Sequence, residues 1–448
     1  MPADKLLLIS CYFPPAGGIQ VLRALSLAKY LPQNQFEVHV LTTRNPAVPT
    51  YDEALLDQIP SAVRIHRAWT LEPPFFLRKK LWSRIKGKNA RTDSSGTTNS
   101  AAGGLKYRLA ARVTRLLSPD PQVLWRPFAF RKAASLIERE KINFVLVTAP
   151  PFSAFLIGNA LKLRYPHIHL ISEVRDEWLN YFLNEFAFRG DDFVRTQARE
   201  IERNTVELSD RVVTVTQATR DAMRARYSDQ PDEKFGLIFN GYDAAEFESF
   251  RSRPHGTDKI VVAHLGTVYR PTSPAAYLDA LDSLPEEIRS RFETRFIGRI
   301  AEEFDRSLLT HRKSSTKFIG FVPHGEAVRH MEESDYLLLP WADRFNVPGK
   351  LYEYLASGKP VIGLVPPRSD ADRILRESGS ALLADGSDIG QIRQVLRRSA
   401  DPATAAALRP DREAIQRYER SRLTAEYAGL IRSCVAARQV PNTIVGVR

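Results

Sequence analysis

The sequence predicts an α/β fold in two halves, each a parallel sheet covered by helices on both faces. Short apolar runs alternate with amphipathic helical patterns through both halves, as expected of βαβ units. The chain has 448 residues, which leaves room for two or three domains. Apolar residues make up 43% of it and charged residues 26%, and these fractions exclude a disordered or collagen-like chain.

In the first half, a glycine-containing turn follows the first predicted strand and leads into a helix predicted at 21–30. Ligands of parallel sheets gather at the carboxyl ends of the strands, so the residues directly after each strand are the candidates for function. The strands of this half are predicted at 5–10, 36–42, 144–148, 168–172 and 211–216.

A break between the halves is predicted at the turn residues 240–243 and the polar segment 251–257. We expect a first domain at 1–240, a linker at 241–257 and a second domain at 258–410. The strands of the second half are predicted at 259–265, 294–297, 317–321, 336–340 and 360–365.

Positive charge is concentrated in one segment of the chain. The net charge is +12, from 64 Lys and Arg against 52 Asp and Glu. Between Arg78 and Arg115 lie eleven basic residues and one acidic residue, Asp93, so this segment alone carries +10. Charge this local predicts one anionic partner surface rather than a generally basic protein.

Two basic amphipathic helices are predicted within 75–117, around a Ser-, Thr- and Gly-rich stretch at 92–104 that is expected to be flexible. With Phe75, Phe76 and Trp82 on the apolar side, these helices fit contact with an anionic membrane surface. They fit equally well two helices that pack on a core and show basic faces to solvent. Nucleic acid is a weaker third option, because the aromatic residues are not interleaved as a stacking platform.

The cysteines and the apolar runs indicate the compartment. The two cysteines, Cys11 and Cys434, form no disulfide framework and fit a reducing cytosol. The longest uncharged stretch, 143–161, is interrupted by two prolines and predicts strand, loop and helix rather than a membrane span. No signal-peptide pattern is found. We expect a cytoplasmic protein, either free or bound to the inner face of the cytoplasmic membrane.

Two segments of the first half carry candidate functional residues. In the first, Gly17 and Gly18 would let the backbone approach a ligand closely in front of a helix N-terminus. The second is the Arg-Asp-Glu-Trp sequence at 175–178, a group of charges at the end of a buried strand. This group fits a ligand site and an Arg–carboxylate pair that fixes the loop about equally well.

The segment 345–363 of the second half is the most informative. Pro348 and Gly349 open a predicted helix, and Lys350 and Glu353 lie on one side of it. A helix N-terminus with a lysine suits a diphosphate. A nearby carboxylate suits the hydroxyls of a ribose.

The order and spacing of these motifs resemble the family 4-like glycosyltransferases of GT-B architecture, over nearly the whole chain. The resemblance implies two facing Rossmann-like domains, with a nucleotide sugar bound mainly to the second, and C-terminal helices at 411–448 that cross back to the first domain. The motifs that carry it stand at 12–18, 148–153, 175–178, 240–243, 264–267, 318–323 and 348–363.

The resemblance also implies roles for individual residues. Glu353 matches the glutamate that contacts the nucleotide ribose, and Lys350 lies where basic contacts to the diphosphate are expected. Arg270 is implied as a second cation at the diphosphate, and Asp176 as a residue of the interdomain cleft. Catalytic roles are therefore expected for Lys350, Arg270 and Asp176. Donor binding is expected for Gly17, Gly18, Gly266, Thr267, Pro348, Gly349, Lys350, Leu351 and Glu353.

The chain departs from the family pattern at three places. Many relatives carry a glutamate that faces the donor sugar where this chain has Phe345. No lysine follows Arg270, although a basic pair is often found there. The Arg-Asp-Pro-Trp often seen in this subgroup is Arg-Asp-Glu-Trp here, with Glu177 in place of the proline.

The implied reaction is transfer of a hexose from a nucleotide-diphosphate sugar to a glycan, lipid-linked or small-molecule acceptor, with retention, in cell-surface polysaccharide or glycoconjugate synthesis. No metal or other cofactor is expected, because the sequence has no HExxH motif and no Cys/His cluster. No paired Asp/Glu motif fits a double displacement, which favours attack by the acceptor on the face that the phosphate leaves. The alternatives are a nucleotide-sugar-binding protein without turnover, a membrane-peripheral scaffold, and an epimerase on a similar fold.

Overall fold

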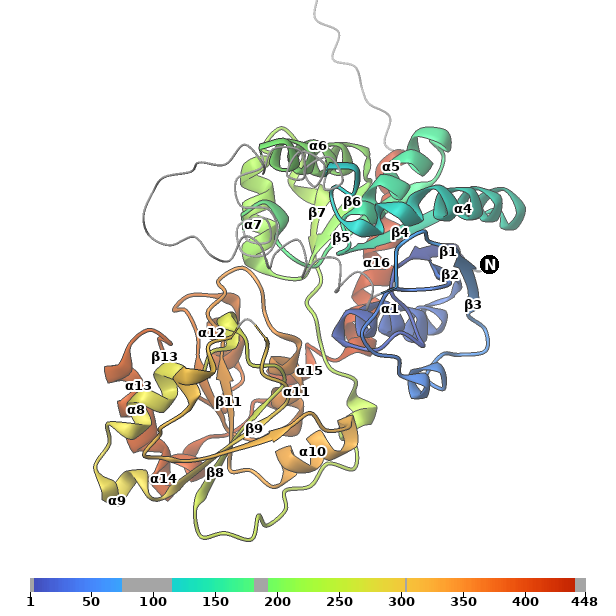
Figure 1. The fold of residues 1–448 in the computed structure, drawn as a ribbon. Helices are drawn as coiled ribbons and strands as arrows, with labels where there is room; N and C mark the ends of the chain where they lie inside the picture. The colour runs from blue at the N-terminus through green and yellow to red at the C-terminus, as the bar shows by residue number, and fades with distance from the viewer. Residues whose placement is uncertain (1–3, 75–114, 181–191, 303, 440–448) are drawn as a thin grey trace, which may run out of the picture. The chain divides into compact units, whose positions relative to one another are not determined.

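The computed structural model describes residues 4–74, 115–180, 192–302 and 304–439 (Figure 1). The chain divides into two compact units. Unit 1 comprises Met1–Val215, Thr219–Ile238 and Thr424–Arg448, and unit 2 comprises Thr216–Ala218 and Phe239–Leu423. The basic segment predicted at 75–117 and the flexible stretch predicted at 92–104 lie outside the described residues, apart from 115–117.

Unit 1 is built on a parallel sheet of seven strands in the order β3-β2-β1-β4-β5-β6-β7. The central strands are wholly buried, as expected of a sheet covered on both faces. The strands are β1 (Asp4–Ile9), β2 (Phe36–Thr43), β3 (Arg64–Ala68), β4 (Phe144–Ala149), β5 (His169–Val174), β6 (Arg211–Thr214) and β7 (Phe235–Leu237).

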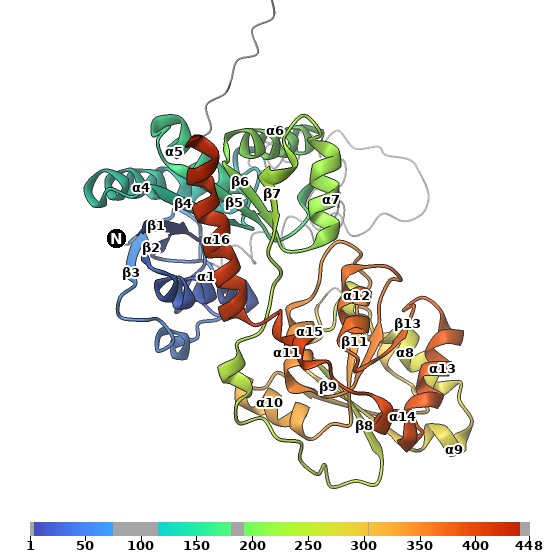
Figure 2. The same ribbon diagram turned by 180° about the vertical axis from the view of Figure 1, so that it is seen from behind.

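Helices cover both faces of this sheet. They are α1 (Ile19–Tyr30), α4 (Arg126–Glu140), α5 (Ser153–Arg164), α6 (Asp192–Leu208), α7 (Gln217–Arg226) and α16 (Arg420–Gln439). Buried side chains of α4, α5 and α6 form one apolar cluster with the sheet. Helix α16 crosses the opposite face, in front of the sheet in Figure 2 and behind it in Figure 1.

A buried ion pair joins α1 to the centre of this sheet. The guanidinium of Arg23 donates to Oε1 of Glu173 at 2.8 Å, and Thr148 donates to Oε2 at 2.7 Å. Burial alone would raise the pKa of Glu173, but the charge and hydrogen bonds of Arg23 outweigh burial and lower it. Arg23 also lies 5.6 Å from the ring centroid of Tyr427 on α16. The C-terminal helix is thus packed into unit 1, as predicted.

The return of the chain to unit 1 comes later than the predicted boundary at 411. Residues 411–423 belong to unit 2. The reason is burial, because Ile415 and Tyr418 pack in the core of unit 2. Tyr418 also accepts a hydrogen bond from the amide of Tyr242 at 3.1 Å, which places part of the expected linker 241–257 in the same unit.

Unit 2 is built on a parallel sheet of six strands in the order β10-β9-β8-β11-β12-β13. Its helices are α8 (Ala275–Asp282), α9 (Glu286–Arg289), α10 (His324–Glu332), α11 (Gly349–Ser357), α12 (Asp370–Glu377), α13 (Ile389–Ser399), α14 (Pro402–Ala407) and α15 (Arg412–Gln416). The apolar residues of α8 and α13 form one buried cluster with the sheet, and those of α11 and α12 form another. The strands are β8 (Ile260–Leu265), β9 (Phe292–Ile297), β10 (Ser315–Gly320), β11 (Tyr336–Pro340), β12 (Val361–Leu364) and β13 (Ala381–Ala384).

The predicted α/β fold with two parallel sheets is confirmed, and each strand predicted from the sequence is present with small shifts at its ends. Strands β3, β7 and β13 were not predicted. They are short, and they lie at or next to the edges of the sheets, where burial is incomplete and the apolar pattern is weak.

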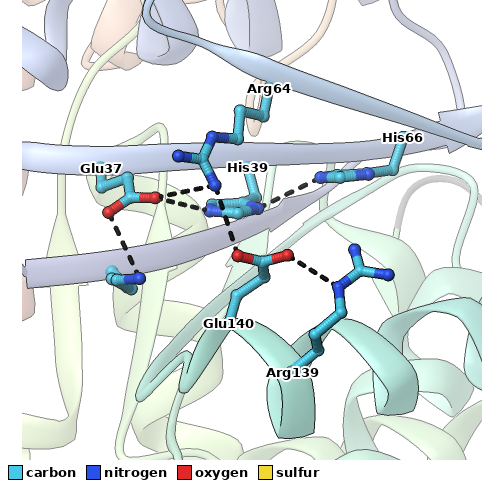
Figure 3. Close-up of polar contacts among 7 residues, drawn as sticks. Glu37, His39, Arg64, His66, Arg139 and Glu140 are labelled. Carbon is cyan, nitrogen blue, oxygen red and sulfur yellow. Dashed lines mark hydrogen bonds and ion pairs between the residues drawn. The ribbon is translucent and has the colours of Figure 1, made fainter.

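A histidine pair lies at the β3 edge of unit 1 (Figure 3). The rings of His39 and His66 stack at 5.3 Å, and Nδ1 of His39 lies 3.1 Å from Nε2 of His66. Glu37 contacts Nε2 of His39 at 3.2 Å. Burial and the neighbouring His39 lower the pKa of His66 to about 4, so the folded protein favours neutral rings.

This pair predicts a loss of stability in mild acid. In the unfolded chain His66 takes up a proton near its ordinary pKa of 6.5, whereas the folded protein resists this until about pH 4. Stability should therefore fall as the pH drops from about 6.5 toward 4. His66→Gln should reduce the loss between about pH 7 and 5 by about 1 kcal/mol, measured by urea unfolding. His167→Gln, at an exposed histidine of the same unit, is the control, and equal losses in both variants would contradict the assignment.

Candidate functional site

The topology of unit 2 marks one place on its sheet for a ligand. The chain runs outward from β8 through β9 to β10 and then returns to β11 on the other side of β8. The order of the strands therefore reverses between β8 and β11. In open parallel sheets ligands bind beyond the carboxyl ends of the strands at this point. Gly266 follows β8 directly, and α11 begins shortly after β11.

Gly266 and Lys350 meet at this point. Gly266 has a φ of +109°, which favours glycine, and a Cβ atom placed on it would lie 3.2 Å from Nζ of Lys350. The ammonium of Lys350 is thus held against the backbone of Gly266. The expected proximity of these two residues is present in the structure.

His264, the last-but-one residue of β8, holds the ammonium of Lys350 in place by a hydrogen bond. Nδ1 of His264 lies 3.0 Å from the carbonyl oxygen of Leu338, so Nδ1 carries the proton and donates. Nε2 is then free to accept from Nζ of Lys350 at 3.2 Å. Burial and the charge of Lys350 hold the pKa of His264 well below its ordinary value, and the ring stays neutral.

The ammonium itself is poorly compensated. Burial lowers the pKa of Lys350 to about 7, and the carboxylate of Glu353 opposes this only in part. The attraction of Glu353 therefore does not offset the loss of water around this ammonium. An anion bound beside it would supply further counter-charge.

The N-terminus of α11 lies at the same place. Pro348 is its N-cap residue without a side-chain hydrogen bond, and the first turn contains no acidic residue. The positive end of the helix is therefore not neutralised from within the chain. We call Gly266, Lys350 and the start of α11 at Pro348–Gly349 the anion cradle. Its geometry fits the phosphates of a nucleotide.

The loops after β8, β9 and β10 are joined by their backbones. The amide of Gly266 donates to Ile297 at 2.7 Å, and the amide of Gly298 donates to Gly320 at 2.7 Å. Gly298 has a φ of +145°, and a Cβ atom on it would lie 2.1 Å from the carbonyl oxygen of Gly266. A glycine is thus required at 298 for the cradle to hold its shape.

Beside the cradle lies a cavity of about 430 Å³, lined by Gly266 and by aromatic side chains. Phe318 stacks on Phe296 with ring centroids 5.0 Å apart, and Phe321 is 66% exposed. The guanidinium of Arg299 lies 4.6 Å from the centroid of Phe321. Exposed ring faces of this kind can stack on a planar group. The sequence predicted none of these roles, although an aromatic residue directly after a strand-ending glycine could have indicated Phe321.

Arg270 follows Gly266 in the same segment of unit 2. It begins the short 3-10 helix Arg270–Thr272 and lines a second cavity, of about 490 Å³, with Trp341, Arg344 and Asp385. The expected role of Arg270 at the diphosphate stays a prediction.

The other predicted donor residues of unit 2 differ in exposure. Thr267 is exposed beside Gly266, and Glu353 is half-buried on α11. Leu351 has no exposed surface, and its amide donates to the carbonyl of Pro348, so the structure gives it a role in packing.

The loop between β11 and α11 is shaped by Asp343. Its buried carboxylate accepts hydrogen bonds from the amides of Phe345 and Asn346 at 2.8 and 3.3 Å. The indole of Trp341 donates to the carbonyl of Asn346 at 2.7 Å. Phe345, half-buried in this loop, therefore stands in an ordered position where relatives carry a glutamate.

The candidates of unit 1 lie at the carboxyl ends of its strands. Gly18 is exposed with a φ of +100° and is the N-cap residue of α1, whereas Gly17 is buried and donates to the carbonyl of Thr50 at 3.0 Å. The guanidinium of Arg175 donates to the carbonyls of Gln20 and Pro150 at 2.9 and 2.6 Å. Arg175 thus fixes two loops, and its half-buried neighbour Asp176 stays a candidate on sequence grounds alone.

Metal ligands and membrane spans were searched among the described residues. No three His, Cys, Asp or Glu side chains in this part of the chain lie close enough together to hold a metal ion. No helix of the described ranges is long and apolar enough to cross a membrane.

Comparison with known proteins finds a family model that matches part of the chain. Residues 90–246, about a third of the chain, match the family model Glycosyltransferase Family 4. No curated protein matches the sequence. The family match, together with the fold, confirms the resemblance to family 4-like glycosyltransferases of GT-B architecture.

Several solved structures share the fold. HepE of Anabaena, in complex with UDP and glucose, has a TM-score of 0.62 at 14% identity over 96% of this chain and 100% of HepE. WaaG, a glycosyltransferase involved in lipopolysaccharide biosynthesis, has a TM-score of 0.53 at 14% identity over 98% and 100%. A Listeria monocytogenes protein assigned as a UDP-N-acetylglucosamine 2-epimerase has a TM-score of 0.51 at 13% identity over 97% and 97%. At these identities the likeness shows the two-domain fold.

The backbone contact at Gly298 predicts a sharp effect of one methyl group. Gly298→Ala should destabilise the protein by about 1–3 kcal/mol, because the new Cβ overlaps the carbonyl of Gly266 and the φ is unfavourable. The measurement is the urea midpoint. Gly325→Ala on α10 is the matched control, since a Cβ there meets no atom within 4 Å and alanine favours a helix. Equal midpoints in the two variants would show that the loops do not depend on this contact.

Proposed function

We propose that the protein is a glycosyltransferase that takes a sugar from a nucleoside diphosphate sugar bound to unit 2 and transfers it to an acceptor hydroxyl. The observation that carries this proposal is the poorly compensated ammonium of Lys350 at the anion cradle. A diphosphate brings the negative charge that this ammonium lacks. The start of α11 adds backbone donors on the same side.

The aromatic cavity supports a nucleotide rather than a simple phosphate. It adjoins the cradle through Gly266, and Phe321 offers an exposed ring face. A base stacked there would leave its ribose and phosphates to reach toward Lys350 and Glu353. HepE, which shares the fold, is described in complex with UDP-glucose, and this agrees with the proposal for the donor.

We extend the proposal to a retaining reaction. The acceptor oxygen would bond to the anomeric carbon while the bond from that carbon to the diphosphate oxygen breaks, and the acceptor proton would pass to the departing diphosphate. Lys350 would stabilise the charge that develops on this leaving group. Phe345 stands in the loop where many relatives carry a second acidic residue. The cradle therefore offers no carboxylate pair for a double displacement. No cofactor besides the nucleotide sugar is proposed.

For the acceptor we propose a glycan or a lipid-linked sugar of cell-surface polysaccharide synthesis. The support is the likeness to WaaG, which is involved in lipopolysaccharide biosynthesis. The predicted basic segment at 75–117 fits an enzyme that works at an anionic membrane surface in the cytoplasm.

Two specific observations favour other functions. Phe345 in place of a glutamate favours a protein that binds nucleotide sugars without turnover. The likeness to an assigned 2-epimerase favours isomerisation of the same donor. An assay for nucleotide release with and without acceptor separates the three, because only a transferase releases nucleotide in proportion to glycosylated acceptor.

Removal of the cradle cation predicts loss of donor binding. Lys350→Ala should weaken UDP binding at least tenfold and reduce turnover about a hundred- to thousand-fold, because the diphosphate loses its counter-charge. Glu353→Ala should weaken UDP binding by loss of the ribose contact. Calorimetric titration measures both.

Lys313→Ala, at an exposed lysine of unit 2, is the control for net charge. The folded state is checked by thermal unfolding, where Lys350→Ala should be as stable as the parent or more stable, since a half-buried cation is removed. Unchanged UDP affinity in both Lys350→Ala and Glu353→Ala would refute the site.

The pKa of Lys350 predicts how donor binding depends on pH. In the free protein this pKa is about 7, and a bound diphosphate should raise it by favouring the ammonium. Affinity for UDP-glucose should therefore fall as the pH rises from about 7 to 9, by up to about tenfold per pH unit, with proton uptake on binding. Lys350→Arg, which stays charged, should give a flat profile. A flat profile in the unmodified protein would mean that Lys350 gains no proton on binding.

A further inference from the structure

A small polar cavity in unit 1 is not explained by the proposed donor chemistry. Its volume is about 200 Å³, below the about 300–1,000 Å³ typical of pockets for whole small-molecule ligands. It has room for a compact group rather than for a nucleotide. We call it the arginine pocket, and it is lined by Leu179, Asn180, Arg195, Arg199 and Arg226.

Three guanidinium groups reach this cavity from two helices. Arg195 and Arg199 stand four residues apart on α6 and share a face of it, and Arg226 is the last residue of α7. Like charges at this spacing destabilise a helix. Arg199 is exposed and makes no hydrogen bond or ion pair with the described part of the chain. The repulsion between these like charges is therefore offset either by other contacts of the fold or by a bound anion.

Arg226 is held in place by buried carboxylates. Its Nη2 donates to Oε1 of Glu177 at 2.8 Å, and its Nε donates to Oε1 of Glu202 at 2.8 Å. Glu177 has no exposed surface, and Glu202 also accepts from the hydroxyl of Tyr227 at 2.8 Å. Two ion pairs fix the direction of this guanidinium, so it is a preorganised group and not a mobile surface charge.

Glu177 is one of the places where the chain departs from the family pattern. The glutamate stands where the related motif has a proline, and a proline could not have paired with Arg226. Its other oxygen accepts from the amide of Asn180 at 2.5 Å, and Asn180 lines the pocket. The departure therefore positions two lining residues, Arg226 and Asn180.

We propose that the arginine pocket binds a phosphate or diphosphate group and that, if the proposed transferase function holds, this group belongs to the acceptor. Planar guanidinium groups bind phosphate oxygens in pairs and keep their charge at every physiological pH. A phosphate would bring negative charge to Arg199, which makes no ion pair within the described part of the chain. The acceptor class that this favours is a phosphorylated or diphosphate-linked sugar.

The test uses pyrophosphate as the probe and the Lys350→Ala protein as the background, so that the anion cradle does not compete. Pyrophosphate should bind to Lys350→Ala, measured by calorimetry. Addition of Arg199→Gln should weaken this binding about tenfold or more, the loss expected for a charged hydrogen bond. Arg199 is exposed and makes no ion pair with the residues that the structure describes, so this change should leave the thermal midpoint unaltered.

Arg224→Gln is the matched control. Arg224 also lies on α7, carries the same charge and pairs with Asp232 outside the cavity. It should leave pyrophosphate affinity within about twofold of the background. No pyrophosphate binding to Lys350→Ala, or equal weakening by Arg199→Gln and Arg224→Gln, would overturn the proposal.

A second arm separates an acceptor phosphate from a membrane headgroup. Vesicles of phosphatidylcholine with phosphatidylglycerol should sediment equal amounts of the Arg199→Gln and Arg224→Gln proteins if the pocket takes a phosphate of the acceptor. Arg199-dependent sedimentation without Arg199-dependent pyrophosphate binding would overturn the proposal. Donor binding is tested by the Lys350 variants, whereas phosphate binding in the arginine pocket is tested by Arg199→Gln. Either proposal can therefore be refuted without refuting the other.

Discussion

The contact between the ammonium of Lys350 and the backbone of Gly266 is the constraint on which the proposed donor site of unit 2 depends. A side chain at 266 would displace the ammonium, and an acid in the first turn of α11 would neutralise it. His264 can accept from Lys350 only because its other nitrogen donates to Leu338. The protein thus holds a cation that its own Glu353 compensates only in part, and an anion bound beside it would lower the cost of burying that charge.

The same site depends on glycines in a second way. A Cβ atom on Gly298 would overlap the carbonyl oxygen of Gly266. The amide of Gly298 also donates a hydrogen bond to the carbonyl oxygen of Gly320. Hydrogen bonds thus join the ends of three strands. The aromatic cavity lies at these ends, because Phe318 is in β10, Gly320 ends β10 and Phe321 follows directly. The shape for a base and the shape for a diphosphate are consequently fixed by the same hydrogen bonds.

Much of this arrangement could be predicted from the sequence, because long apolar runs set the central strands and the helix at 349–357 has clear start and stop residues. The resemblance implied that Lys350 and Gly266 both bind the donor phosphates, but it did not predict their direct contact. His264 could not be predicted, since its role depends on Leu338, a residue far away in the chain. The role expected of Arg270 stays a prediction, because the direction of an exposed side chain is set by neighbours that periodicity does not reveal.

The two units hold positive charge by opposite physical means. Lys350 is a desolvated ammonium whose proton is only loosely kept, so an anion at the cradle is bound together with a proton. The arginine pocket uses guanidinium groups that stay charged, and Glu177 orients one of them, Arg226. A leaving group is stabilised by a cation that becomes more fully protonated as negative charge develops beside it. A substrate that is only positioned is bound well by groups of constant charge. The difference in cation type therefore agrees with the proposals of a reacting phosphate at unit 2 and a non-reacting phosphate at unit 1.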